Sequence, residues 1–218
     1  ETELGFAVLS DLANPARSWS AVQASANRVE FVGIPEVEVT GTELTVNINK
    51  ASSGGLLVDF AASPLTISTG PGQEIELTMA AARGELIEAS GAVVLGVSDF
   101  LRVEGEFGFV RSIETVTLGD ARTVSVNSLT VGGSGLTAFV GVNGGDSEQA
   151  GLTVSGFEFG FAAFTDRTDP ARAWTAVRGS AARAAALGIP GVTLAAEDLV
   201  IEINRAAADG SLIDFAAA

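Results

Sequence analysis

The sequence contains a long internal repeat. Residues 1–63 and 156–218 align without a gap at an offset of 155, and 28 of the 63 aligned positions are identical. Because self-similarity at a fixed period marks repeat architectures, we predict that the chain is a segment of a longer array of tandem repeats. Residues 1–63 would then be the C-terminal part of one repeat. Residues 64–218 would be one further full period, in a single continuous structure.

A finer repeat within the 155-residue period is expected, because solenoid units usually span about 20–50 residues. The segment 101–109 resembles 152–161, and short L-x-V/I beginnings recur at Leu44 and Leu65. This pattern predicts several degenerate coils of about 20 residues each. The fold class that follows is all-β, a β-solenoid (β-helix) built from stacked short strands.

Alternation of apolar and polar residues supports the all-β prediction. In 101–109 the odd-numbered positions are apolar or glycine, whereas the even positions 102, 104 and 106 are charged. The same alternation occurs in 36–39, 44–48 and 74–79, and glycine-rich turn signals separate these runs. Such a pattern is typical of strands that bury one face and expose the other.

The segment 169–188 is ambiguous. It has Asp169 as a helix cap, Pro170 at the first position, many alanines and a closing glycine, which together indicate a helix. Its counterpart 14–33 contains several serines and the run Arg28–Val32, which is typical of a strand. Because homologous segments share one structure, we predict strands in 14–33. A helix at 170–187, laid across the solenoid, is the alternative.

The composition excludes several kinds of chemistry. The chain has no histidine, cysteine or tyrosine, and Lys50 is its single lysine. Histidine triads, thiol nucleophiles and histidine or thiolate zinc sites are therefore excluded. The net charge of −15 repels nucleic acid and anionic membrane surfaces. No apolar run reaches the roughly 20 residues of a spanning helix. We expect neither nucleic-acid partners nor membrane insertion.

Two repeated polar positions are predicted to stabilise turns. Asn49 and Asn204 follow matching isoleucines and precede turns, where asparagine side chains satisfy backbone groups. Asp59 and Asp214 lie in matching V/I-D-F-A-A segments. For these we expect a turn cap or a solvated strand-edge charge, with a calcium ligand as the alternative.

One loop has the composition of a calcium site. Asn143, Asp146 and Glu148 offer oxygen ligands among glycines, but the loop matches neither the EF-hand pattern nor the calcium β-roll nonapeptide. We therefore expect no obligatory cofactor and keep Ca²⁺ as an alternative at these three residues.

Paired carboxylates are the remaining candidate for catalysis. Glu104 and Glu106 share one strand face, a spacing that suits a glycosidase pair. The same arrangement recurs at 36/38 and 74/76, and Arg102 stands beside the first pair. An active site would not occur three times over, so we expect a solvated strand face and no enzymatic activity.

A tryptophan follows an arginine at the same place in both copies. Trp19 follows Arg17, and Trp174 follows Arg172, in the shared pattern P-A-R-x-W-[ST]-A-V. If exposed, such a pair would suit an interaction surface. A buried tryptophan that fills a coil end is the alternative that small neighbouring residues favour.

The motifs shared by residues 1–63 and 156–218, together with 84–91 (GELIEASG) and 132–144 (GGSGLTAFVGVNG), resemble the long repeats of giant bacterial secreted or surface proteins of the adhesin-like kind. The resemblance implies an extracellular or cell-surface location and an elongated protein, and it transfers no catalytic residues. The function that we predict is structural or adhesive: a rod or filament formed by end-to-end self-stacking of β-coils. The alternatives are a calcium-dependent carbohydrate- or ligand-binding module and a carbohydrate-active β-helix enzyme.

Overall fold

A computed structural model describes residues 1–144 and 148–217. Nine strands form one sheet in the order β1-β2-β3-β6-β7-β8-β9-β10-β11, and β4 and β5 form a separate hairpin. The strands are β1 (Thr2–Ser10), β2 (Ser18–Phe31), β3 (Val37–Lys50), β4 (Leu65–Gly70), β5 (Gln73–Leu77), β6 (Leu86–Val97), β7 (Leu101–Thr117), β8 (Thr123–Val142), β9 (Ala150–Asp166), β10 (Ala173–Leu187) and β11 (Ala195–Arg205). A short 3-10 helix, η1, spans Ala81–Arg83.

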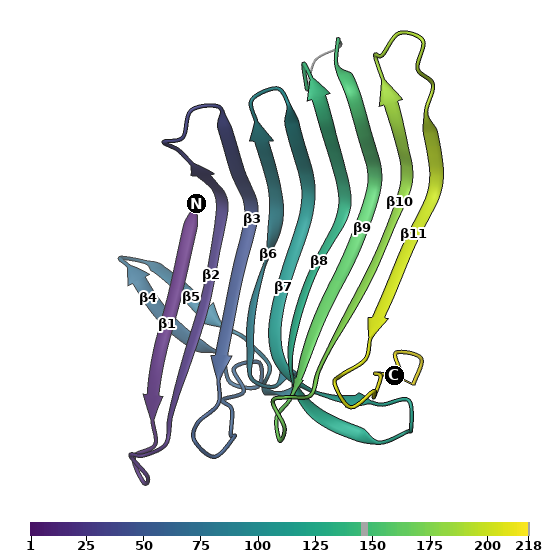
Figure 1. Cartoon of the computed structure of the whole chain (residues 1–218). Helices are drawn as coiled ribbons and strands as arrows, with labels where there is room; N and C mark the ends of the chain where they lie inside the picture. The colour runs from purple at the N-terminus through teal and green to yellow at the C-terminus, as the bar shows by residue number, and fades with distance from the viewer. Residues whose placement is uncertain (145–147, 218) are drawn as a thin grey trace.

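The all-β prediction is confirmed, but the stacked-coil solenoid is not. Every neighbouring pair in the large sheet is antiparallel, and the order across the sheet follows the order along the chain. Figure 1 shows the strands side by side in one layer, joined by hairpin turns at both ends. The alternation in the sequence identified strands correctly, because it arises when the two faces of a sheet have different surroundings. It does not indicate which strands pair with each other.

The helix predicted as the alternative at 170–187 is wrong, and the strand predicted in 14–33 is correct. Residues 173–187 form β10, which pairs along its length with β9 on one side and β11 on the other. Ladders on both sides satisfy most of the backbone of β10, so tertiary pairing overrides the helix propensity of its alanines. Ala181 and Ala185 are buried there.

The repeat has the same register in both copies. Leu9 lies opposite Trp19, and Phe164 opposite Trp174, 155 residues later. Ala21 lies opposite Asn49, and Ala176 opposite Asn204. The triplet β1–β3 holds places one to three in the sheet, and β9–β11 holds places seven to nine. The 155-residue period therefore corresponds to six strands of one sheet plus the β4–β5 hairpin.

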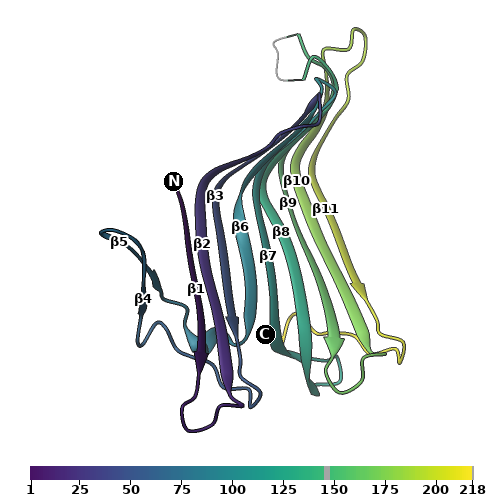
Figure 2. The ribbon, with the colours of Figure 1, turned by 90° about the vertical axis from the view of Figure 1, so that its left-hand side faces the viewer.

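A line of irregular residues crosses the sheet and bends it. Positive φ angles and register shifts occur at neighbouring positions of β3, β6, β7, β8, β9 and β11, at Glu43, Gly91, Gly105, Gly135, Gly156 and Asp198. Such bulges kink a strand and increase its twist, and Figure 2 shows the strands leaning over together in their upper part. Leu44 packs over Gly91 and Leu136 over Gly105: a Cβ there would lie 2.5 and 2.6 Å from the leucine Cδ2 atoms.

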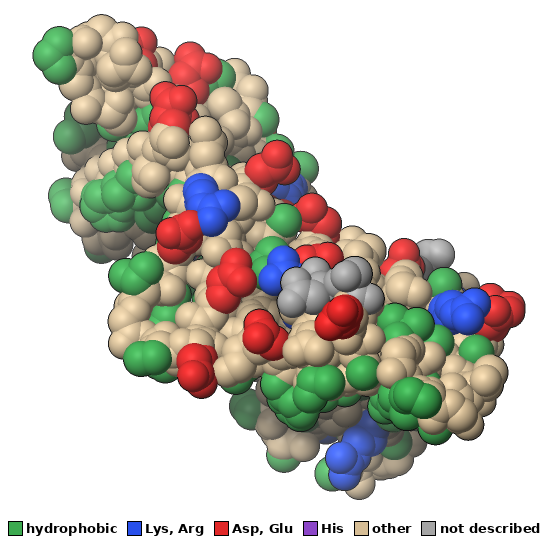
Figure 3. Space-filling view, turned by 90° about the horizontal axis from the view of Figure 1, so that it is seen from above, with side chains coloured by type: hydrophobic (Ala, Val, Ile, Leu, Met, Phe, Trp, Pro, Cys, Tyr) green, Lys and Arg blue, Asp and Glu red, His purple; other side chains and the backbone are tan. Residues whose placement is uncertain are grey.

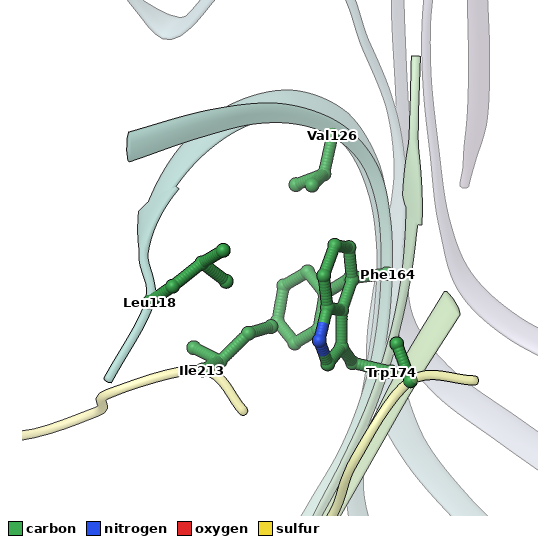
Figure 4. Close-up of a cluster of buried hydrophobic side chains, with 6 residues drawn as sticks. Leu118, Val126, Phe164, Trp174 and Ile213 are labelled. Carbon is green, nitrogen blue, oxygen red and sulfur yellow. The ribbon is translucent and has the colours of Figure 1, made fainter. Parts of the chain in front are cut away.

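Two small hydrophobic cores lie on one face of the sheet, near its lower end. The first joins Ala7 and Ala21 to Phe60, Leu77 and Met79, which belong to the segment around the β4–β5 hairpin. The second, drawn in Figure 4, comprises Leu118, Val126, Phe164, Trp174, Ala207 and Ile213. It forms where the end of the β7–β8 hairpin curls against the segment after β11.

The two equivalent tryptophans should differ in their contribution to stability. Trp174 is 1% exposed, whereas Trp19 is only half-buried. Since large core truncations cost about 3–5 kcal/mol, we expect Trp174→Ala to lower the free energy of unfolding by about that amount and Trp19→Ala by clearly less. Urea unfolding followed by circular dichroism measures both, with Leu12→Ala at an exposed loop as the control. Equal losses for the two tryptophans would contradict this packing.

Candidate functional site

An Asp–Arg pair closes the turn after the first strand of each copy. Arg172 Nη1 lies 3.0 Å from Asp166 Oδ2, and Arg17 Nη1 lies 3.2 Å from Asp11 Oδ2. The aspartates also accept a backbone hydrogen bond from Thr168 at 2.7 Å and from Ala13 at 2.8 Å. The guanidinium of Arg172 stacks over the Trp174 ring at 5.3 Å and reaches Asp209 at 3.1 Å. This arrangement holds the turn.

The tryptophans point into the fold. Trp174 Nε1 donates to the Ser211 carbonyl oxygen at 3.0 Å, and Trp19 Nε1 donates to the Leu56 carbonyl oxygen at 2.9 Å. Both bonds tie a sheet strand to the loop that follows the third strand of the copy. The structure therefore places Trp174 and Arg172 in a packed corner, and Trp19 and Arg17 in the same corner with more exposure.

The repeated asparagines lie near the ends of β3 and β11 and bond to that same loop, which contains the repeated aspartates. Asn49 Nδ2 donates to the Val58 carbonyl oxygen at 3.2 Å, and Asn204 Nδ2 to that of Ile213 at 2.9 Å. Asp59 Oδ1 accepts hydrogen bonds from the backbone of Ala61, Ala62 and Ala81. Asp214 Oδ1 accepts one from Ala216 at 2.9 Å.

The loop proposed for calcium is described only at its ends. Asp146 lies outside the described residues. Asn143 Nδ2 donates to the Glu148 carbonyl oxygen at 3.3 Å. Within residues 1–144 and 148–217, no group of three or more acidic side chains is arranged to hold a metal ion.

Two of the paired glutamates, Glu38 and Glu104, form ion pairs with Arg102 in the upper part of the sheet. Arg102 lies between Glu104 at 3.1 Å and Glu38 at 3.6 Å. Ser98 Oγ donates to Glu36 Oε2 at 3.0 Å, beside a hollow of about 330 Å³. Figure 3, which views the molecule from above, shows acidic side chains across these upper strand ends. Arg102 therefore contacts Glu104, one member of the Glu104/Glu106 pair, and Glu38, one member of the 36/38 pair.

The largest feature that remains is one apolar face of the sheet. Residues directly opposite one another across a sheet share a face. One such line, the apolar row, crosses all nine strands and is wholly hydrophobic: Leu4, Ala24, Val46, Ala89, Phe109, Val131, Phe161, Val177 and Ile203. A second line above the bend is also apolar: Phe31, Val39, Leu95, Val103, Ala138, Val154, Ala184 and Ala196.

The opposite face is polar or small at all the adjacent positions except Val110. The line next to the apolar row contains Gly5, Gln23, Asn47, Glu88, Val110, Thr130, Ala162, Ala176 and Asn204. Both small cores pack on this second face, where Ala7 lies opposite Ala21 and Phe164 opposite Trp174. No described element packs on the apolar face, whose lower border carries Lys50, Arg111 and Arg205.

The two outer strands expose their apolar side chains most. On β1, Leu4, Phe6 and Val8 are about 60% exposed, and on β11 Val200 is 64% and Ile201 is 55% exposed. The strand that corresponds to β11 is β3, which pairs on both sides, and its Leu44, Val46 and Ile48 are half-buried. The apolar face and the two unpaired edges are therefore the candidate interaction site.

Comparison with known proteins assigns no family. No protein-family model, curated protein or solved structure matches the chain. The part of the chain that the structure describes contains no helix with the length and hydrophobicity of a membrane-spanning helix. The site must therefore be interpreted from its own geometry.

The alternation along each separate strand indicates part of the apolar face, but not the face as a whole. The alternation in 101–109 indicates which side of one strand is apolar. Recognising the face requires the register of all nine strands together, and the bulges shift the alternation partway along several of them. The edges follow from strand order, which the sequence pattern does not contain.

Acid should weaken the Asp–Arg corner. Hydrogen bonds from the backbone and hydroxyl of Thr168 hold the pKa of Asp166 below its usual value, and those from Ser211 do the same for the pKa of Asp209. A lowered folded-state pKa stabilises the protein above the unfolded value of about 3.9, and that stabilisation is lost as the pH falls through the folded pKa.

We therefore expect the melting temperature to fall when the pH is lowered below about 4. Asp166→Asn should melt lower than the wild type at pH 7 and lose less on acidification. Thermal melts at several pH values test this, with Asp99→Asn at an exposed turn as the control. A variant that melts in parallel with the wild type throughout would refute the role of Asp166.

Proposed function

We propose that the chain is a structural or adhesive module of an extracellular or cell-surface tandem-repeat protein. In this proposal each repeat adds six strands to one antiparallel sheet, in place of the stacking of solenoid coils. The observation that carries the proposal is the equivalence of β1–β3 and β9–β11, which have one register and one set of turn contacts at places one to three and seven to nine of a single sheet.

An even number of strands per repeat lets the sheet continue without interruption. Neighbouring strands alternate in direction, so after six strands the next copy starts in the same direction as the last. Strands are spaced about 4.8 Å apart, so each repeat would lengthen the sheet by roughly 29 Å across the strands. The product is an elongated ribbon, which suits extension or display.

Separate copies of this chain can associate only in certain ways. With nine strands, β1 and β11 run in the same direction. Direct head-to-tail contact would therefore be parallel, unlike every other pair in the sheet. Antiparallel pairing joins β11 to β11 or β1 to β1, each about a twofold axis. Alternation of these two contacts gives a filament.

We expect thin filaments in electron micrographs of the concentrated protein. Ile201→Lys with Ile203→Lys places charges on the β11 edge, and edge lysines prevent strand addition. This variant should stop at discrete dimers formed through β1, whereas Leu12→Lys, at a fully exposed loop position, should assemble like the wild type.

Filaments that persist unchanged in the edge variant would contradict assembly through β11. Filaments that form only with calcium, and vanish in a chelator, would support the calcium-dependent alternative instead.

The apolar face favours a second function, contact with lipid hydrocarbon. The apolar row is free of charge over nine strands, while basic residues mark its lower border and the ionic pairs lie on the other face. Exposed apolar patches of this extent mark interaction sites. This candidate departs from the expectation that the acidic chain avoids membranes, which was based on net charge rather than on a face.

Flotation with phosphatidylcholine vesicles tests the second function. Phe109→Glu with Phe161→Glu removes two aromatic contacts worth about 2 kcal/mol each, so vesicle binding should weaken by more than about tenfold. The control carries Gln23→Glu and Thr130→Glu on the opposite face and should float like the wild type. Equal binding by both double variants, or none by the wild type, would exclude lipid contact through this face.

A further inference from the structure

A groove of about 790 Å³ lies over β7–β11. Gly108, Gly132 and Gly160, neighbours across β7, β8 and β9, line it together with Ala176 and Phe215. The ring centroids of Phe215 and Phe164 lie 6.2 Å apart. Because Phe164 belongs to the second small core, the groove lies on the face that carries the small cores. Glycines and alanines leave this part of the sheet flat and open.

The equivalent place in the first copy is filled by the β4–β5 hairpin. Gly5 corresponds to Gly160 at the 155-residue offset. A Cβ on Gly5 would lie 2.9 Å from Ile75 Cγ2, 3.1 Å from Leu77 Cδ2 and 3.3 Å from Ile67 Cδ1. A Cβ on Gly160 would meet no atom within 4 Å.

A second pair of equivalent residues gives the same result independently. Phe60 is 2% exposed, because it packs with Leu77 and Met79, and its backbone N–H donates to the Met79 carbonyl oxygen at 3.0 Å. Phe215, the corresponding phenylalanine, is 51% exposed. The same side chain is therefore buried where the hairpin is present and exposed where it is not.

The net charge around the groove is the same as around the hairpin site of the first copy. Glu74 and Glu76 of the hairpin line the same hollow as Gln23. The counterparts of Gln23 and Asn47, which both line that hollow, are Arg178 and Glu202; these two line the groove and pair with each other at 3.3 Å. Two amides of the first copy are thus replaced by an ion pair, so an acidic hairpin strand placed here would meet surroundings of the same net charge.

We propose that this groove is the docking site for a β-hairpin, the counterpart of residues 64–83 in the following repeat of the array. The hairpin supplies apolar side chains at the positions of Ile67, Ile75, Leu77 and Met79, and it covers Phe215. The inference rests on the proposed tandem function and adds the segment by which one repeat is fastened onto the face of the previous one.

A chain extended by a second copy of residues 64–83 after Ala218 tests this directly. Ala218 corresponds to Ser63, so the junction reproduces the native connection to Pro64. The extension should raise the melting temperature by at least about 3 °C, since one kcal/mol shifts a chain of this size by roughly 2–4 °C. Hydrogen exchange in 206–217 should slow as well.

Gly160→Leu serves as the blocking variant, because the site has room for a side chain unless the hairpin is bound. It should leave the melting temperature of the unextended chain unchanged and abolish the rise in the extended chain. Gly54→Leu, at an open loop glycine, is the matched control and should retain the rise.

An extension that changes neither melting nor exchange, or whose effect survives Gly160→Leu, would overturn the proposal. The readout does not depend on filaments, because the hairpin docks on the face and leaves the β11 edge unpaired. Failure of edge assembly and failure of hairpin docking are therefore distinguishable.

Discussion

Antiparallel backbone pairing between consecutive strands is the interaction on which the rest of the structure depends. Each interior strand of the sheet exchanges hydrogen bonds with the strand before and the strand after it. Contacts between elements outside this ladder are few and involve the β4–β5 hairpin, the loop after each third strand and the curled end of β7–β8. A fold held in this way has no inherent end, since either edge can accept a further strand.

The single layer explains both the small cores and the apolar face. A sheet normally buries a hydrophobic face against a second layer, yet here only the lower part of one face is covered. Phe60 and Trp174 are buried where a neighbouring segment reaches them, and Phe215 and Trp19 are more exposed where the equivalent segment is not present. In the proposed array, each repeat would complete the packing of its neighbour.

Much of the local structure could be predicted from the sequence. The repeat, the all-β character and the strand in 14–33 follow from self-similarity and alternation, and the homologous segment 14–33 could have removed the helix at 170–187. The solenoid could not be tested in that way, because a strand pattern does not specify its neighbour. The candidate site was harder to predict, since the apolar row emerges only from the register of nine strands, and the equivalence of Gly5 and Gly160 has meaning only once the hairpin is seen.

The central claim is that a repeat extends the sheet through the β11 edge. The most direct measurement is backbone hydrogen exchange in a chain in which residues 64–218 are repeated after Ala218. The account predicts that the outward-facing amides of β11 become as slow to exchange as those of β3, because a strand equivalent to β6 now pairs with them. Amides of β11 that still exchange at the rate of an open edge would contradict it.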